Sequence, residues 1–328
     1  NDIMLDGKLF KRVKSVFEQI SPSMKKQDKK LTEVWYKEFI RNGATLGEDE
    51  KEKLRKLDAE LSTLAPQFQN NNLNATNSYE LWLKKEDLGG LPEISVNAAK
   101  VEATKKGKPN EWLITLQMPS FQPFMTFSSN RALRKEIMSA FSKKCNGDGF
   151  DNTSIIKKIV KLKHKRARLL GFDNFADYIL EKRMAENQDN IMNFLNDLYE
   201  SCFELAKEDL AQVQKLAFEL DGIKNIQKWD FAYYSEKLKK KLYDFDDDAL
   251  RPYFKSENVI NGVFEVAKKL YGLEFKPLDN VQTYHEDVNV YEVLSDKGEH
   301  VGILYEDLFP RETKRSGAWM NELRSQGM

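Results

Sequence analysis

Apolar residues return every three or four positions along most of the chain, which is the spacing of one face of an α-helix. The longest stripe covers residues 191–220. It predicts a helix of roughly 30 residues, longer than most helices of globular proteins. Shorter stripes at 13–20, 54–68 and 259–270 predict further helices.

Residues that favour helix ends lie where these stripes begin and end. Asn152 stands just before an apolar-periodic run, in the position of an N-cap. Gly171 and Gly272 each follow basic residues. Both are expected to be C′ glycines that come after basic last turns.

Two regions depart from the helical spacing. Residues 111–127 alternate in polarity and contain Pro119 and Pro123, which predicts two short strands joined by a proline turn. Residues 286–309 predict a hairpin around a Ser-Asp-Lys-Gly turn. The predicted fold class is mainly α, with a few short antiparallel strands in these two regions.

The best internal boundary in the sequence is the Gly-Gly pair at residues 89 and 90. It separates a helical segment, residues 1–88, from residues 89–328, which are mostly helical with small strands. No internal repeat or low-complexity linker interrupts either segment.

Composition limits the classes of partner. Apolar residues make up 41%, charged residues 32% and aromatic residues 11% of the 328 residues, which fits a helix-rich folded protein rather than a disordered one. The 52 basic and 52 acidic residues balance, whereas nucleic-acid binders usually carry a basic excess. A basic stretch at 157–168 is interleaved with apolar residues and predicts the solvated face of an amphipathic helix. No apolar run is long enough to cross a bilayer, so neither nucleic acid nor membrane is an expected partner.

The two cysteines, Cys145 and Cys202, form no C-x-x-C pair and are expected to be free thiols in or near the core. This usage is consistent with a reducing compartment, and a cytoplasmic location is favoured. The chain begins at Asn1 rather than at methionine, within sequence that already predicts folded structure. The loss of an amino-terminal segment, such as a removed signal peptide, therefore stays an open alternative.

The histidines give little support for a metal site in this chain. His164, His285 and His300 are far apart, so the His-Glu-x-x-His pair of a zinc helix is absent. Ligand-type residues occur in series only at 285–287, just before a predicted strand, where neighbouring side chains point to opposite faces. Ordinary loop hydrogen bonds are the preferred interpretation there. No Ser/His/Asp or Cys/His arrangement can be paired from the sequence.

A set of motifs carries a family resemblance. Residues 305–320, YEDLFPRETKRSGAWM, strongly resemble the D-L-[FY]-x-R-x-x-K-R-x-G-A-W-M segment of zinc metallopeptidases of the thimet oligopeptidase, peptidyl-dipeptidase and oligopeptidase A family. Further matches follow the order of the family: L-x-x-P and N-R at 113–131, RARLLGF with FADY at 166–178, WDFAYY at 229–234, and RPYF with GVF at 251–264. Any one of these motifs is weak, but the ordered set is strong.

The resemblance implies a fold and a chemistry. Members of this family are helical ellipsoids with a deep channel that admits short unfolded peptides. Zinc is held by both histidines of a His-Glu-x-x-His helix and by a later glutamate, and the motif glutamate acts as general base on the zinc-bound water. The peptidyl-dipeptidase branch, which removes dipeptides from the carboxyl end of peptides, is favoured here.

The sequence departs from the family at its end. It stops at Met328, soon after the G-A-W-M residues, and the zinc helix of the family would lie beyond that point. The resemblance then implies a truncated internal fragment without catalytic or metal-binding residues, whose intact parent uses zinc. The residues nearest to the missing site, by position in the motif, are Arg311, Lys314, Arg315 and Trp319. They are candidates for the substrate channel, either through packing and salt bridging at a strand end or through contact with a peptide carboxylate.

Two alternatives stay open. One is a non-catalytic helical module that binds peptides or a protein partner. The other is a split enzyme that a second chain completes.

Overall fold

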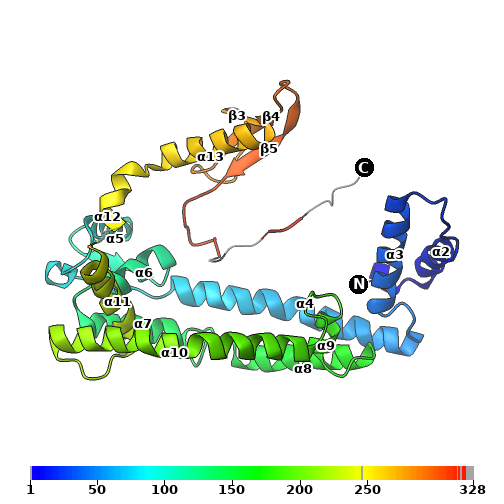
Figure 1. Cartoon of the computed structure of the whole chain (residues 1–328), viewed down its shortest axis with the longest axis horizontal. Coiled ribbons are helices and arrows are strands. Elements are labelled where there is room, and N and C mark those ends of the chain that lie inside the picture. The colour runs from blue at the N-terminus through cyan, green and yellow to red at the C-terminus, as the bar shows by residue number, and fades with distance from the viewer. Residues whose placement is uncertain (1, 245–246, 316, 318–319, 323–328) are drawn as a thin grey trace. The chain divides into compact units, whose positions relative to one another are not determined.

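The computed structural model describes residues 2–244, 247–315, 317 and 320–322. It separates into two compact units, Asn1–Asp230 and Phe231–Met328 (Figure 1). Gly89 and Gly90 lie in the first unit, and a finer division there stays a prediction. The predicted mainly α class is confirmed, with small antiparallel sheets in both units.

The first unit is built from helices and one pair of short strands. Its elements are α1 (Asp2–Leu5), α2 (Gly7–Glu18), α3 (Lys26–Arg41), α4 (Glu48–Asn77), β1 (Leu81–Leu83), η1 (Lys85–Leu88), α5 (Glu93–Lys105), β2 (Trp112–Ile114), α6 (Met118–Phe127), α7 (Arg131–Lys143), α8 (Thr153–Leu169), α9 (Phe175–Leu180) and α10 (Gln188–Asp221). The next helix, α11 (Lys228–Tyr243), contains the boundary between the units.

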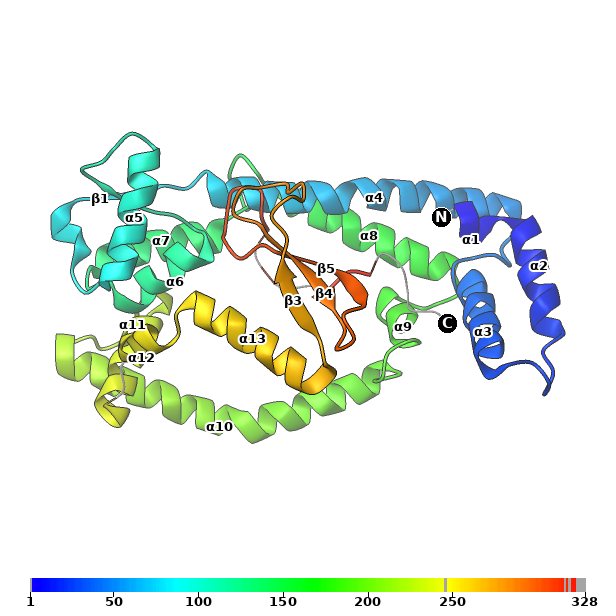
Figure 2. The same ribbon diagram turned by 90° about the horizontal axis from the view of Figure 1, so that it is seen from above.

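Helices α4 and α8 run side by side through the first unit (Figures 1 and 2). Leu64, Ile155 and Leu162 form the buried seam between them. The basic stretch on α8 meets acidic residues of α4, since Lys158 pairs with Glu60 and the Arg166 Nε lies 2.7 Å from Asp58 Oδ1. The predicted amphipathic helix is confirmed, and part of its basic face is neutralised by α4.

Of the two strands predicted for residues 111–127, the structure contains the first and has a helix in place of the second. Strand β2 pairs antiparallel with β1, so the first predicted strand is confirmed. The second is wrong, because residues 118–127 form α6. Pro119 lies in the first turn of this helix, where its missing N–H is not needed. Phe121, Phe124 and Met125 then bury themselves at helical spacing in the core of β1, β2, α5 and α7.

The predicted glycine helix ends are confirmed. Gly171 and Gly272 follow α8 and α13 (Ser256–Tyr271) with φ of +89° and +69°, which a residue without Cβ adopts at little cost. Asn152 does precede α8, but its side chain makes no capping hydrogen bond. It donates to the Phe68 carbonyl (3.1 Å) and accepts from Asn71 (2.9 Å), so it joins α8 to α4.

The long stripe predicts α10 correctly. Val213, Leu216 and Ala217 are buried near its carboxyl end, and Gly222 closes the helix with φ of +68°. Residues 192–212 are exposed. Cys202 lies within this exposed part and is itself exposed, so its expected place in the core is wrong. Cys145 is half-buried, and both thiols are free, as predicted.

The second unit carries the other sheet. Its remaining elements are α12 (Asp247–Leu250), η2 (Arg251–Tyr253), α13, β3 (Glu274–Pro277), β4 (Asn289–Leu294) and β5 (His300–Glu306). The predicted hairpin is β4–β5, closed through the Ser295–Gly298 turn. Strand β3 pairs antiparallel with β4 and was not predicted. Phe264 of α13 stacks on Phe275 at 4.2 Å between ring centroids and fixes the helix on the sheet.

Within the described part of the chain, no helix combines the length and the apolar character needed to cross a lipid bilayer.

Candidate functional site

Two of the four candidate residues meet around one carboxylate just after β5. The Arg311 guanidinium places Nη1 2.8 Å from Asp307 Oδ1 and Nη2 2.7 Å from Oδ2. Lys314 Nζ lies 2.7 Å from Oδ1, and the Tyr284 hydroxyl donates to Oδ2 at 3.1 Å. We call these four residues the Asp307 cluster. It ties the segment that leaves the sheet back onto the end of its last strand.

The Lys314 ammonium has no donor left for a ligand in this arrangement. Besides the Asp307 carboxylate, it donates to the backbone carbonyls of Asp307 (2.9 Å) and Phe309 (2.6 Å). An ammonium has three N–H donors, and these contacts use all three. The geometry therefore fits salt bridging at a strand end, the first of the two roles that the sequence predicts.

Electrostatics in the Asp307 cluster follow from these contacts. Hydrogen bonds from Arg311, then from Lys314 and Tyr284, hold the pKa of Asp307 well below its usual range despite partial desolvation. The same carboxylate raises the pKa of Arg311. Asp307 is thus an anion at any physiological pH, and it suits neither a general acid nor a general base.

The other two candidates are Arg315 and Trp319. Arg315 is exposed. Trp319 lies outside the described residues. Asp307 and Tyr284 are not among the residues predicted from the sequence. For Asp307 the available signal was an acid four positions before Arg311 and seven before Lys314.

Two of the family-like motifs meet in the first unit. Arg131 of the N-R motif forms a bidentate ion pair with Asp230 of the W-D motif, with distances of 2.8 and 2.7 Å. Arg134, one turn further along α7, is buried and donates to the carbonyls of Ser128 (2.6 Å) and Trp229 (2.9 Å) and to Asp230 (3.4 Å). These contacts pin the start of α11 to α7.

Burial alone would raise the pKa of Asp230, and it is the largest single influence on this group. The hydrogen bonds from Arg131 and from the Gln227 backbone, together with the charge of Arg134, outweigh it and hold the pKa below the usual range. Asp230 therefore serves as a buried counter-charge. Arg134 is not among the residues predicted from the sequence.

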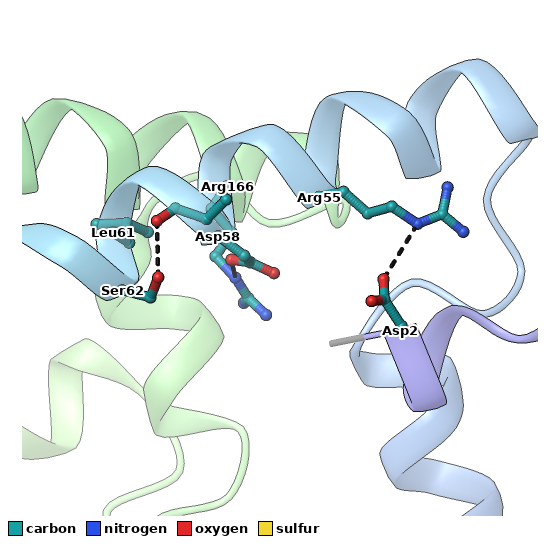
Figure 3. A pocket seen from close by; sticks show the side chains of 7 residues that line it. Asp2, Arg55, Asp58, Leu61, Ser62 and Arg166 are labelled. Carbon is teal, nitrogen blue, oxygen red and sulfur yellow. Dashed lines mark hydrogen bonds and ion pairs between the residues drawn. The ribbon is translucent and has the colours of Figure 1, made fainter.

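An open pocket of about 530 Å³ lies between α1, α4 and α8 (Figure 3). Asp58 and Arg166 pair on its wall at 2.7 Å, and Asp2 pairs with Arg55 at 3.6 Å. The other described residues that line it are Ala59, Leu61 and Ser62. No nucleophile and base pair among them, so the pocket presents paired charges rather than a reactive centre.

The three histidines of this chain lie in separate surroundings. His285 Nδ1 accepts from the Asp287 backbone at 3.2 Å, as the loop interpretation predicts. His300 Nδ1 lies 3.0 Å from Glu292, and His164 is exposed on α8. Among the residues that the structure describes, no three His, Cys, Asp or Glu side chains gather as a metal-binding group.

Comparison with protein families gives a match to the model of peptidase family M3 over residues 124–327. The chain belongs to peptidase family M3. The matched part contains the 305–320 segment, the W-D and N-R motifs and nearly all of the second unit, so the family resemblance of the sequence is confirmed.

Curated members of the family show the same similarity. Oligopeptidase A of Escherichia coli is 37% identical over 304 residues, which cover 91% of this chain and 45% of the relative. Dipeptidyl carboxypeptidase of Escherichia coli is 32% identical over 330 residues, 99% of this chain and 48% of the relative. Saccharolysin of Saccharomyces cerevisiae is 28% identical over 330 residues, 96% of this chain and 45% of the relative. The chain thus spans about half the length of these M3 relatives.

Proposed function

We propose that this chain is the scaffold half of a zinc metallopeptidase that hydrolyses short peptides. The observation that carries the proposal is the family M3 match over residues 124–327, with the motifs in family order. In the intact enzyme, zinc would polarise the scissile carbonyl and activate water. The described residues of this chain supply no ligand set for it. We therefore infer that the chain alone neither binds zinc tightly nor hydrolyses peptides.

The finer proposal is release of dipeptides from the carboxyl end of peptides. It is supported by a relative named dipeptidyl carboxypeptidase, whose similarity extends over 99% of this chain. Internal cleavage is the second candidate, since the relative named oligopeptidase A has the higher identity, 37%.

Within this function, the segment 311–319 would border the substrate channel. The Asp307 cluster supports a division of roles in which Arg311 and Lys314 hold the segment against β5. Arg315, whose side chain is exposed, and Trp319 are the proposed candidates for contact with a peptide. Such a contact would use the Arg315 guanidinium for the terminal carboxylate.

The proposed location is the cytoplasm. Two free thiols and a 32% identical relative named probable cytosolic oligopeptidase A support it. A relative named organellar oligopeptidase A has the same identity, so targeting must be read from the gene itself.

The decisive first observation is the coding sequence after Met328. A His-Glu-x-x-His motif there supports the zinc peptidase. A stop codon, together with peptide affinity and no turnover, would replace it with a non-catalytic binding module. A stop codon with activity restored by a second chain would indicate a split enzyme.

Activity is tested by fusing the chain, after its last residue, to the carboxyl-terminal remainder of Escherichia coli oligopeptidase A. A quenched fluorescent peptide with a free carboxyl end and the same peptide with an amidated end serve as substrates. The fusion should hydrolyse the first with added zinc, while the 328-residue chain should not. Loss of activity on the amidated peptide supports dipeptide release, and equal activity on both supports internal cleavage. Hydrolysis by the purified 328-residue chain would overturn the proposal.

A further inference from the structure

Helix α10 carries a broad apolar surface that the described residues of its own unit leave uncovered. Leu195, Leu198, Tyr199, Cys202, Phe203 and Leu205 define this surface, which we call the α10 arc. At 3.6 residues per turn these positions spread over about half of the helix circumference. A helix that packs by one face onto a core shows an apolar stripe at least about 100° wide, so the arc is wide enough for such packing.

The exposure of the α10 arc is high for residues of this kind. The exposed fractions of its five large apolar and aromatic residues run from 38% at Phe203 to 62% at Leu205, and Cys202 is exposed as well. Tyr199 and Phe203 stack on each other, with ring centroids 4.6 Å apart, and form an aromatic pair open to solvent. A contiguous exposed apolar surface is a feature of contacts with another chain or segment.

Further along the helix, residues of the same apolar stripe are buried. Val213, Leu216 and Ala217 continue the line of Leu195, Leu198 and Cys202 and are buried. In Figure 2, the earlier turns of α10 run apart from the α4–α8 pair, and the helix approaches its own unit beside α9 and near its end. The α10 arc therefore continues the buried face of the helix. Among the described residues of the first unit, none packs over this part of the face.

The charge of α10 disfavours a second copy as the partner. Helix α10 has eight acidic residues against two lysines, a net charge of −6. At 3.6 residues per turn, Asp197, Glu200, Glu204 and Glu208 lie on the helix face opposite the arc. Two copies that packed arc to arc would still bring two strongly acidic helices together, and like charges oppose association. These charges do not obstruct an apolar helix that packs on the arc itself.

We propose that the α10 arc packs against a helix from the half of an M3 peptidase that this chain does not span. The proposal rests on the proposed function, because it assumes that such a half completes the protein. The length relation supports this occupant, since the 304 matched residues make up 45% of Escherichia coli oligopeptidase A. The apolar arc would then become an internal face of the whole enzyme.

Cys202 gives a direct probe, because it is exposed and lies in the middle of the arc. Its alkylation by N-ethylmaleimide is measured by peptide mass spectrometry in the 328-residue chain and in the oligopeptidase A fusion described above. Burial raises the pKa of Cys145, and this half-buried thiol serves as the internal reference. We expect Cys202 to react at least tenfold more slowly in the fusion, while the rate at Cys145 stays within about twofold.

Paired variants of the fusion locate the protection on the arc. Leu198→Lys with Leu205→Lys places two charges on it and should restore fast labelling of Cys202. Asn193→Lys with Ser201→Lys adds the same charge to the polar side of α10 and should keep Cys202 protected. Equal labelling of Cys202 in the fusion and in the 328-residue chain would overturn the proposal.

Self-association is the competing outcome. If the 328-residue chain dimerises at micromolar concentration and this dimer alone protects Cys202, a second copy occupies the arc and the proposal fails. The labelling needs neither zinc nor peptide. A protected Cys202 in a fusion without peptidase activity would therefore reject the proposed function and leave the interface standing.

Discussion

Arg131 and Asp230 are 99 positions apart in the chain and form a bidentate ion pair, with Nε 2.8 Å from Oδ1 and Nη2 2.7 Å from Oδ2. The Asp230 side chain is fully buried, as is that of Arg134, which shares the same carboxylate. The pair joins α7 to the first turn of α11. It therefore fixes the point at which the chain leaves its first unit.

The Asp230→Asn variant should lose about 3 kcal/mol of unfolding free energy at pH 7, since removal of one partner leaves a buried guanidinium without its counter-charge. Urea unfolding followed by circular dichroism measures the loss. Asp173→Asn is the matched control, because its pair with Arg168 is solvent-exposed. The control should change stability by less than about 0.5 kcal/mol. A loss below about 1 kcal/mol in Asp230→Asn would show that Arg134 is satisfied by its carbonyl acceptors alone.

At acid pH, the difference in unfolding free energy between the parent protein and Asp230→Asn should disappear. The pKa of Asp230 in the folded protein lies below the ordinary value of 3.8, so the unfolded chain binds the proton more readily. The stabilisation is therefore complete above about pH 5 and falls as the pH drops from about 4 through the folded pKa. Urea midpoints of the parent and of Asp230→Asn at pH 6, 5, 4 and 3 should converge at the acid end. A constant difference between the two proteins would contradict this assignment.

The sequence predicts the long-range architecture where periodicity is strong. The stripes of α4, α10 and α13 are long enough that helix formation follows from the pattern of apolar positions alone. Prediction fails at α6, where two prolines and alternating apolar residues indicate a strand. Tertiary packing decides there, because Phe121, Phe124 and Met125 reach one core only from a helix.

The candidate site shows a different limit. The family motif makes Arg311 and Lys314 candidates, but periodicity cannot show that both turn toward Asp307, since the segment that holds them is irregular. Arg134 was missed for a related reason. A single arginine on an amphipathic helix has the sequence pattern of a solvated residue, and only the approach of Asp230 buries it.

Asn152 is expected to behave as a bridge between helices rather than as a cap. Asparagine and aspartate cap helices about equally well. Asn152→Asp, however, removes the donation to the Phe68 carbonyl and buries a carboxylate in its place. We expect a loss of about 2 kcal/mol in unfolding free energy at pH 7, measured by urea unfolding.

Asn187→Asp is the matched control for that change. Asn187 caps α10 by accepting from the Asn190 backbone at 2.9 Å. An aspartate there keeps the cap and adds a negative charge at the positive end of the helix dipole. Stability should stay level or rise by up to about 0.5 kcal/mol. Equal behaviour of the two variants would show that Asn152 acts as an ordinary cap.

The Asp307 cluster should protect the segment that follows β5 from proteolysis. Trypsin cleaves after Arg311 and Lys314, and both side chains are held by Asp307 in the folded chain. Asp307→Asn removes the charge that gathers them, so cleavage there at pH 8 should accelerate severalfold, as followed by mass spectrometry. Glu299→Gln removes the same charge from the β4–β5 turn, away from the cluster, and should leave the rate unchanged. Cleavage of Asp307→Asn at the parental rate would mean that this segment is ordered by other contacts, and the division of roles between Lys314 and Arg315 would lose its basis.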